Sequence, residues 1–285
     1  MNVRVILISF DGLEYNCVEK YNCQALQQIE HGMIDLTPYQ DHRPRGRGSG
    51  DPFTPEVYAT FITGKVPSES YAEMYQQFDN KYPTIFQFAK NPIAIDVPAY
   101  TPTRDKAWME KLSADPLFRR YWKKEISLAQ IEHELYKWMA AKASFASLID
   151  LLDFDLALIY FRNTDHLHHI YNDMEIYGEH TRKMYQFVEN ITTDMIKVFD
   201  DGKTLIIIFS DHGSNLQGGH SQYGFWSSNI PLGRGMSIKV TDWHDIIKMW
   251  CAVDVDKIKE KVMGKQKFTE RERETIKYLE ALGYL

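Results

Sequence analysis

The sequence predicts an α/β fold with a mostly parallel central sheet and helices on both faces. Short, nearly continuous apolar runs are typical of strands buried on both sides, and three such runs are strong. They are residues 3–10, 156–161 and 204–210, and a weaker fourth candidate is residues 93–97, which Pro98 closes. Helical patterns alternate with these runs, and that alternation indicates a sheet layered with helices.

The helical patterns are defined by apolar spacing and by capping residues. Apolar residues recur three and four positions apart over residues 126–152 and 179–199, as on one face of a helix. A shorter helix is predicted from Pro55 to Thr63, with Thr54 as its N-cap. A last helix begins at the N-cap Thr269 and runs to Leu282, just before Gly283.

A chain of 285 residues suits one large domain with a substantial buried core. We expect a single α/β domain in residues 1–264 and a C-terminal helix in residues 265–285 that packs on it. Loops 38–53 and 98–122 interrupt the pattern and are candidates for a substrate lid. The first of these loops contains three weak candidates for substrate binding, namely Arg43, Arg45 and Arg47.

Composition excludes several classes of protein. With 33 Lys+Arg against 39 Asp+Glu, the net charge is −6, which argues against a nucleic-acid binder with a broad basic surface. No apolar run is long enough to cross a membrane, and the 3 cysteines do not suggest a disulfide framework. The first apolar run ends at Asp11 without a cleavage site, so we expect a cytoplasmic protein. The oligomeric state stays open.

Aspartates and histidines follow each strong strand. They are Asp11 after the first strand, Asp165 and His169 after the second, and Asp211, His212 and His220 after the third. Because the carboxyl ends of parallel strands meet at one edge of a sheet, we expect these side chains to converge there. Carboxylate oxygens and imidazole nitrogens together suit zinc, manganese or iron.

The spacing divides these side chains into two sets of metal ligands. The sets are Asp165, His169 and His220, and Asp11, Asp211 and His212. In the first set, the aspartate and the first histidine are four apart and share a face if the segment is helical. Two ions about 4 Å apart are the usual clamp for displacement at phosphorus. His166 and His168 are expected to support the ligands or to lie at the surface.

Thr54 is the candidate nucleophile. Its hydroxyl is expected at a helix N-terminus, where backbone N–H groups favour anions. A metal ion at that point would lower the pKa of the hydroxyl and prepare it for in-line attack. Simple helix capping is the alternative role, and the two roles are compatible.

Together these segments resemble the alkaline phosphatase superfamily and, within it, the type I phosphodiesterase/nucleotide pyrophosphatase branch. The matching segments, in the family's order, are residues 8–13, 54–64, 164–169 and 210–213, with His220. The resemblance implies an alkaline-phosphatase-like core and a two-metal hydrolase that cleaves phosphodiester or nucleotide pyrophosphate bonds in a small substrate. It also implies two divalent ions, with zinc usual in this branch and manganese common in the mutase branch.

The resemblance assigns a role to each candidate residue. Thr54 would form a covalent phosphothreonine. The metal that activates Thr54 would be held by Asp11, Asp211 and His212, and the metal that activates water would be held by Asp165, His169 and His220. The chain departs from the branch after Pro67, where Ser68–Ser70 replaces the usual His–Gly pair, and near Tyr75, where an asparagine is usual.

Two other functions stay open. One is a phosphomonoesterase or a metal-dependent phosphomutase of the phosphoglycerate-mutase type, which a fixed phosphate site of Arg and Lys residues would favour. The other is a protein that binds metal and a phosphorylated ligand without turnover. A formylglycine-type sulfatase is disfavoured because the nucleophile position holds threonine and no cysteine lies near it.

Overall fold

The computed structural model describes residues 3–40, 52–66, 82–100, 115–171, 174–215, 219–264, 267–283 and 285. Within them, one seven-stranded sheet has the strand order β3-β4-β1-β5-β6-β2-β7. The strands are β1 Arg4–Phe10, β2 Glu30–Asp35, β3 Pro92–Ile95, β4 Leu156–Phe161, β5 Thr204–Phe209, β6 Tyr223–Ser228 and β7 Ser237–Lys239. The four predicted strands are confirmed as β1, β3, β4 and β5.

The sheet is mostly parallel, as predicted, with an antiparallel insertion on one side. β1 lies between β4 and β5 and is parallel to both, and β3 extends the parallel part beyond β4. β6 runs antiparallel to β5 and to β2, while β7 is parallel to β2. The sequence did not predict β2, β6 or β7, because their residues are short runs that mix glycine and polar side chains with apolar ones.

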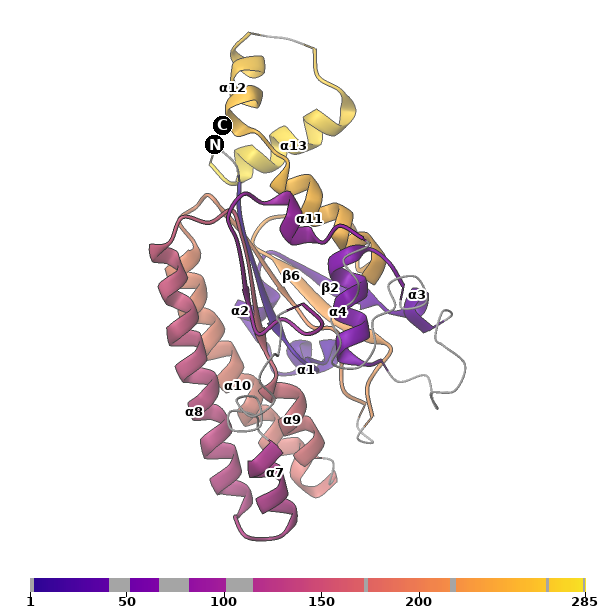
Figure 1. Cartoon of the computed structure of the whole chain (residues 1–285), viewed down its shortest axis with the longest axis vertical. Helices are drawn as coiled ribbons and strands as arrows, with labels where there is room; N and C mark the ends of the chain where they lie inside the picture. Colours follow the sequence, from indigo (N-terminus) through magenta and orange to yellow (C-terminus); the bar gives the residue numbers. More distant parts are fainter. Residues whose placement is uncertain are drawn as a thin grey trace.

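Helices cover both faces of the sheet, as Figure 1 shows. The helices are α1 Tyr15–Lys20, α2 Gln24–Gln27, α3 Thr37–Gln40, α4 Thr54–Thr63, α7 Asp115–Trp122, α8 Leu128–Ser147, α9 Asn163–Ile170, α10 Met174–Phe199, α11 Trp243–Cys251, α12 Val255–Met263 and α13 Glu270–Ala281. Short 3-10 helices are η1 Ile85–Phe88, η2 Leu148–Leu151 and η3 Val240–Asp242. α4 and α11 lie on one side of the sheet, and α8 and α10 lie on the other.

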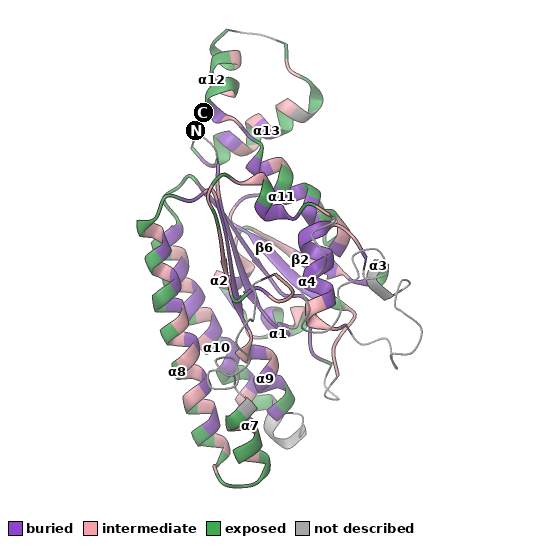
Figure 2. Cartoon of the chain, in the orientation of Figure 1, coloured by how far each residue is buried: buried purple, intermediate pink, exposed green. Residues whose placement is uncertain are grey.

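The sheet separates two apolar cores. Along β1, Val5 and Leu7 face the core beneath α4 and α11, whereas Ile6 and Ile8 face the core beneath α8 and α10. β1, β4 and β5 are buried along almost their whole length, and Figure 2 shows the outer helices buried on one side only. Successive side chains of a strand point to opposite faces of the sheet, which is why neighbouring residues of β1 join different cores. A sheet covered on both faces therefore needs apolar residues at every position.

The predicted long helices are confirmed, with small differences at their ends. α8 begins after Ser127, whose side chain and that of Gln130 form a capping box, so the predicted start at residue 126 was slightly early. The predicted end at residue 152 was late, because η2 forms the last turn. Thr269 caps α13 as predicted, and Leu279 joins the core beneath α11.

The predicted loops are only partly described. Residues 115–122, placed in a loop by the sequence, form helix α7, because the Phe118 side chain is buried against the ring of His166 at 4.6 Å. The remaining lid candidates at residues 41–51 and 101–114 lie outside the described residues. Arg43, Arg45 and Arg47 lie there too, so their proposed contact with substrate stays a prediction.

Candidate metal centre

The candidate ligands meet at the carboxyl edge of the parallel strands. Phe10 of β1 is level with Phe161 of β4, and Ser9 of β1 is level with Phe209 of β5. The three strands therefore end side by side. Asp11 follows β1 directly, and the segments that follow β4 and β5 bring the other candidate ligands to the same edge.

Asp11, Asp211 and His212 form the first cluster, which we call the buried group. His212 Nε2 lies 3.1 Å from Asp11 Oδ1 and 3.5 Å from Asp211 Oδ2. The three ligand atoms lie within 4.8 Å of one another, and all three residues are buried. The hydroxyl of Thr54 adjoins this group, with Oγ1 at 3.5 Å from Asp11 Oδ1 and 3.4 Å from His212 Nε2.

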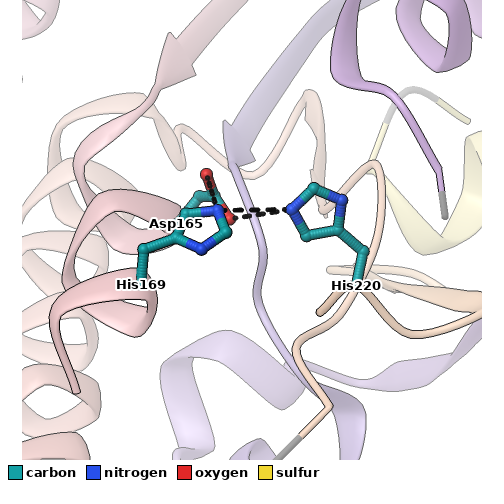
Figure 3. A group of neighbouring side chains, drawn as sticks. All are labelled: Asp165, His169 and His220. Carbon is teal, nitrogen blue, oxygen red and sulfur yellow. Dashed lines mark hydrogen bonds and ion pairs between the residues drawn. The ribbon is translucent and has the colours of Figure 1, made fainter. Parts of the chain in front are cut away.

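Asp165, His169 and His220 form the second cluster, which we call the outer group (Figure 3). His169 Nε2 lies 3.3 Å from Asp165 Oδ2, one helical turn away on α9. His220 Nε2 reaches Asp165 Oδ1 at 3.6 Å from the opposite side. The side chain of His169 is 41% exposed, so solvent reaches this cluster.

Backbone carbonyls orient the histidines that join the two groups. His212 Nδ1 donates to the carbonyl of Gly213 at 3.1 Å, and His220 Nδ1 donates to the carbonyl of Pro52 at 2.7 Å. A carbonyl only accepts, so each Nδ1 carries the hydrogen and each Nε2 is turned toward the carboxylates. Metal-bound histidines are commonly held in this way. The two rings stack with centroids 3.9 Å apart, which places the groups side by side.

Thr54 does not occupy the position predicted for it in the helix. The N-cap of α4 is Phe53, with extended dihedral angles, and Thr54 is the first helical residue. The carbonyl of Phe53 accepts hydrogen bonds from the N–H groups of Glu56 and Val57, which starts the helix one residue early. The threonine hydroxyl is consequently directed at the buried group instead of at the helix backbone.

The electrostatics of the buried group disfavour two bare carboxylates. Burial raises the pKa of Asp211 well above its ordinary value, and the charge of Asp11 raises it further. Burial alone would lower the pKa of His212, but the two carboxylates raise it to about 10. In the metal-free protein, positive charge in this group therefore comes from a protonated histidine.

The outer group has a different balance of charge. Burial opposes ionisation of Asp165, yet the hydrogen bond from His169 and the charges of the nearby imidazoles lower its pKa below the ordinary value. Burial and the charge of His212 lower the pKa of His220, which favours its neutral, ligating form. A histidine must be neutral to bind a metal ion.

The donor set fits two divalent cations. Neither carboxylate oxygen of Asp211 accepts a hydrogen bond from a described residue, although both oxygens are buried. A buried carboxylate without hydrogen bonds is costly, and a bound cation would offset that cost. Mixed oxygen and nitrogen donors of this kind are typical of zinc and manganese sites.

Two glycines allow the groups to approach each other. Gly12 has a φ of +73°, and a Cβ atom there would lie 3.1 Å from Asp165 Cα. A Cβ atom at Gly213 would lie 2.1 Å from Glu14 Oε2 and 2.5 Å from Ser221 Oγ. Only glycine fits comfortably at both positions, so the segments that carry the aspartates and His220 can pack closely.

The structure brings together the seven residues predicted as metal ligands or nucleophile, and it adds supporting residues that sequence reasoning missed. The hydroxyl of Tyr160 donates to Asp11 Oδ2, and the hydroxyl of Thr164 donates to the carbonyl of Asp11. Tyr160 was missed because it lies inside a strand predicted only to be apolar. His166 and His168 are buried, and His168 Nε2 hydrogen-bonds to the hydroxyl of Tyr185 at 3.3 Å.

Solved structures with this fold include the alkaline phosphatase of the Antarctic bacterium TAB5. It superposes with a TM-score of 0.50 at 13% identity, covering 87% of this chain and 98% of that one. The PH0037 protein from Pyrococcus horikoshii has a TM-score of 0.45 at 14% identity over 88% and 97% of the two chains. Murine ectonucleotide pyrophosphatase/phosphodiesterase 5 has a TM-score of 0.42 at 15% identity over 74% and 57%. The first of these similarities establishes the fold.

Two sequence comparisons gave different results. The search of curated proteins found no match to this sequence, whereas a family model did match it. Within the described residues, no helix is both long and apolar enough to cross a membrane. The sequence model of the type I phosphodiesterase / nucleotide pyrophosphatase family matches residues 71–273, which is more than half of the chain. The chain therefore belongs to the type I phosphodiesterase / nucleotide pyrophosphatase family.

Proposed function

We propose that this protein is a two-metal phosphoric ester hydrolase that cleaves phosphodiester or nucleotide pyrophosphate bonds through a phosphothreonine at Thr54. The observation that carries the proposal is the position of the Thr54 hydroxyl, 3.5 Å from Asp11 Oδ1 and 3.4 Å from His212 Nε2. Membership of the family supports the substrate class. Zinc is the proposed ion, with manganese as the alternative.

The residues divide the work between the two groups. Asp11, Asp211 and His212 would hold one cation beside Thr54, and the outer group would hold the other beside the attacking water. When bound, the cations supply positive charge that lowers the pKa of nearby hydroxyl groups and offsets charge developing on the phosphoryl oxygens. The tautomers of His212 and His220, fixed by backbone carbonyls, keep both Nε2 atoms available.

The proposed reaction has two displacements at phosphorus. In the first, Thr54 Oγ1 forms a bond to phosphorus while the bond to the leaving group breaks, and the hydroxyl proton passes to the leaving group or to solvent. In the second, a water oxygen bonds to phosphorus, the bond to Thr54 Oγ1 breaks, and one proton of the water passes to Thr54 Oγ1 directly or through solvent. Positioning and charge stabilisation supply most of the catalysis in such transfers.

The nucleophile is tested by Thr54→Ala with Thr54→Ser as its matched control. Zinc-loaded wild type should hydrolyse bis(p-nitrophenyl) phosphate, and Thr54→Ala should lose about a thousandfold or more in kcat, as expected for removal of a nucleophile. Thr54→Ser keeps the hydroxyl and should retain measurable turnover. Acid-quenched wild type should carry one p-nitrophenylphosphoryl group on the peptide containing Thr54 by mass spectrometry, because the diester loses only one p-nitrophenolate in the first displacement. Undiminished turnover in Thr54→Ala would contradict the assignment.

The substrate class is tested by comparing a diester with a monoester. A higher kcat/KM for bis(p-nitrophenyl) phosphate than for p-nitrophenyl phosphate supports the diesterase assignment. The reverse ratio would favour the monoesterase or phosphomutase alternative. Metal binding without turnover of either substrate, or of a nucleotide pyrophosphate, would favour the non-catalytic alternative.

A further inference from the structure

Two buried tyrosines pack against each other beneath the buried group. Tyr160 of β4 and Tyr58 of α4 meet edge to face, with ring centroids 5.1 Å apart. The exposed fractions of the residues are 5% and 0%. Each hydroxyl has its own partner: Tyr160 donates to Asp11 Oδ2, and Tyr58 shares a hydrogen bond with Ser9 Oγ.

The hydrogen bond from Tyr160 distinguishes the two oxygens of Asp11. Oδ2 accepts from the phenol, while Oδ1 faces His212 Nε2 at 3.1 Å and Thr54 Oγ1 at 3.5 Å. The backbone of Asp11 is fixed as well, because its N–H donates to the carbonyl of Phe161 at 2.9 Å. With one oxygen and the backbone held, the carboxylate has a single orientation, and Oδ1 is the oxygen left for a cation.

We propose that Tyr160 is a positioning residue for metal binding, whose hydroxyl fixes the Asp11 carboxylate so that Oδ1 is presented to a divalent cation beside Thr54. This inference rests on the proposed function. Partners that orient a ligating carboxylate commonly change metal affinity by about 10- to 100-fold when they are removed.

Tyr58 supplies a matched control within the same tyrosine pair. Tyr58 is a residue of the same type, is buried like Tyr160, packs against the Tyr160 ring itself, and also has a hydrogen-bonded hydroxyl. Its partner Ser9 belongs to neither cluster of candidate ligands. Tyr58→Phe therefore removes a buried hydroxyl without releasing a metal ligand.

The experiment is calorimetric titration of metal-stripped protein with Zn²⁺ alone. Wild type should bind at two sites. Tyr160→Phe should bind about 10- to 100-fold more weakly at one site and normally at the other, while Tyr58→Phe should stay within about threefold of wild type at both. Equal affinities in Tyr160→Phe and wild type would overturn the positioning role alone. Absence of zinc binding to wild type would overturn the proposed function as well.

Two further measurements separate positioning from stability. The rise in Tm caused by zinc should be smaller in Tyr160→Phe than in wild type, whatever the Tm of the metal-free variant. An identical rise would show that only folding was affected. Replacement of Tyr160 by 4-aminophenylalanine keeps an aromatic ring and a donor at the same reach, and it guards against misfolding of the Phe variant. It should restore zinc affinity to within about tenfold of wild type, and failure to restore it in a folded protein would contradict the inferred hydrogen bond.

Discussion

The buried group and the outer group use the same donor chemistry in opposite surroundings. The side chains of His212 and Asp11 are 0% and 3% exposed, whereas that of His169 is 41% exposed. Burial raises the pKa of Asp211. Burial acts in the same direction on Asp165, but the histidines beside Asp165 lower its pKa below the ordinary value. The buried group therefore places two carboxylates and one histidine out of water beside the nucleophile, and the outer group keeps an ion pair open to solvent.

The difference separates two tasks that the proposed reaction needs. A buried, preorganised set of carboxylates would hold a cation strongly beside Thr54, as electrostatic catalysis requires. A cluster that solvent reaches admits the water of the second step. The predictions that follow test this contrast, from the largest expected effect to the smallest.

Substitution of one aspartate in each group should change stability with opposite signs. In metal-free protein, Asp211→Asn should raise the free energy of unfolding by about 1–3 kcal/mol. The Asp211 carboxylate accepts no hydrogen bond from a described residue, and the cost of its burial outweighs its 3.5 Å ion pair with His212. Asp165→Asn should lower the free energy of unfolding by about 1 kcal/mol, because it weakens the pair with His169. Both variants should lose zinc-dependent turnover. Urea unfolding of the metal-stripped proteins measures both changes in the free energy of unfolding. Changes of equal sign would contradict the proposed difference between the two groups.

The buried group should also make metal-free protein sensitive to alkaline pH. The folded-state pKa of His212 is raised from 6.5 to about 10, so its contribution to stability is complete below pH 6.5 and is lost as the pH rises through 10. Over this window, the free energy of unfolding should fall with a slope of at most about 1.4 kcal/mol per pH unit. His212→Asn should flatten the slope in urea titrations at several pH values. If the variant kept the wild-type slope, a group other than His212 would cause the pH dependence of stability.

The contact between the two groups is tested at Gly12. Gly12→Ala adds backbone strain at φ +73° and a Cβ atom 3.1 Å from Asp165, so it should cost about 1–3 kcal/mol and reduce zinc affinity. Gly202→Ala is the matched control, because its φ is +72° but, in the part of the chain that the structure describes, no packed neighbour lies within 4 Å of the added atom. It should lose stability only. Equal zinc affinities in the two variants would show that the close approach is unimportant.

Much of this arrangement was predictable because strand ends carry simple rules. Continuous apolar runs identified β1, β4 and β5, and residues after parallel strands must meet at one edge, so the ligand sets followed from order and spacing alone. β2 and β6 were missed because they carry glycine and polar residues, of which Ser227 and Ser228 are buried nonetheless.

Local contacts were harder to predict than topology. Whether Thr54 or Phe53 caps α4 depends on one residue of register, and the sequence favoured Thr54 because phenylalanine is not a usual N-cap residue. The hydrogen bond from Tyr160 to Asp11 joins residues 149 positions apart, and no periodicity encodes such a pair. Tertiary packing decides both, and a single sequence carries little signal for either.

A crystal structure of the zinc-soaked protein, with anomalous scattering at the zinc edge, tests the central claim most directly. The account predicts two peaks about 4 Å apart, one bound by Asp11, Asp211 and His212 beside Thr54 and the other by Asp165, His169 and His220. Peaks located elsewhere, or fully soaked crystals without density between these side chains, would contradict it.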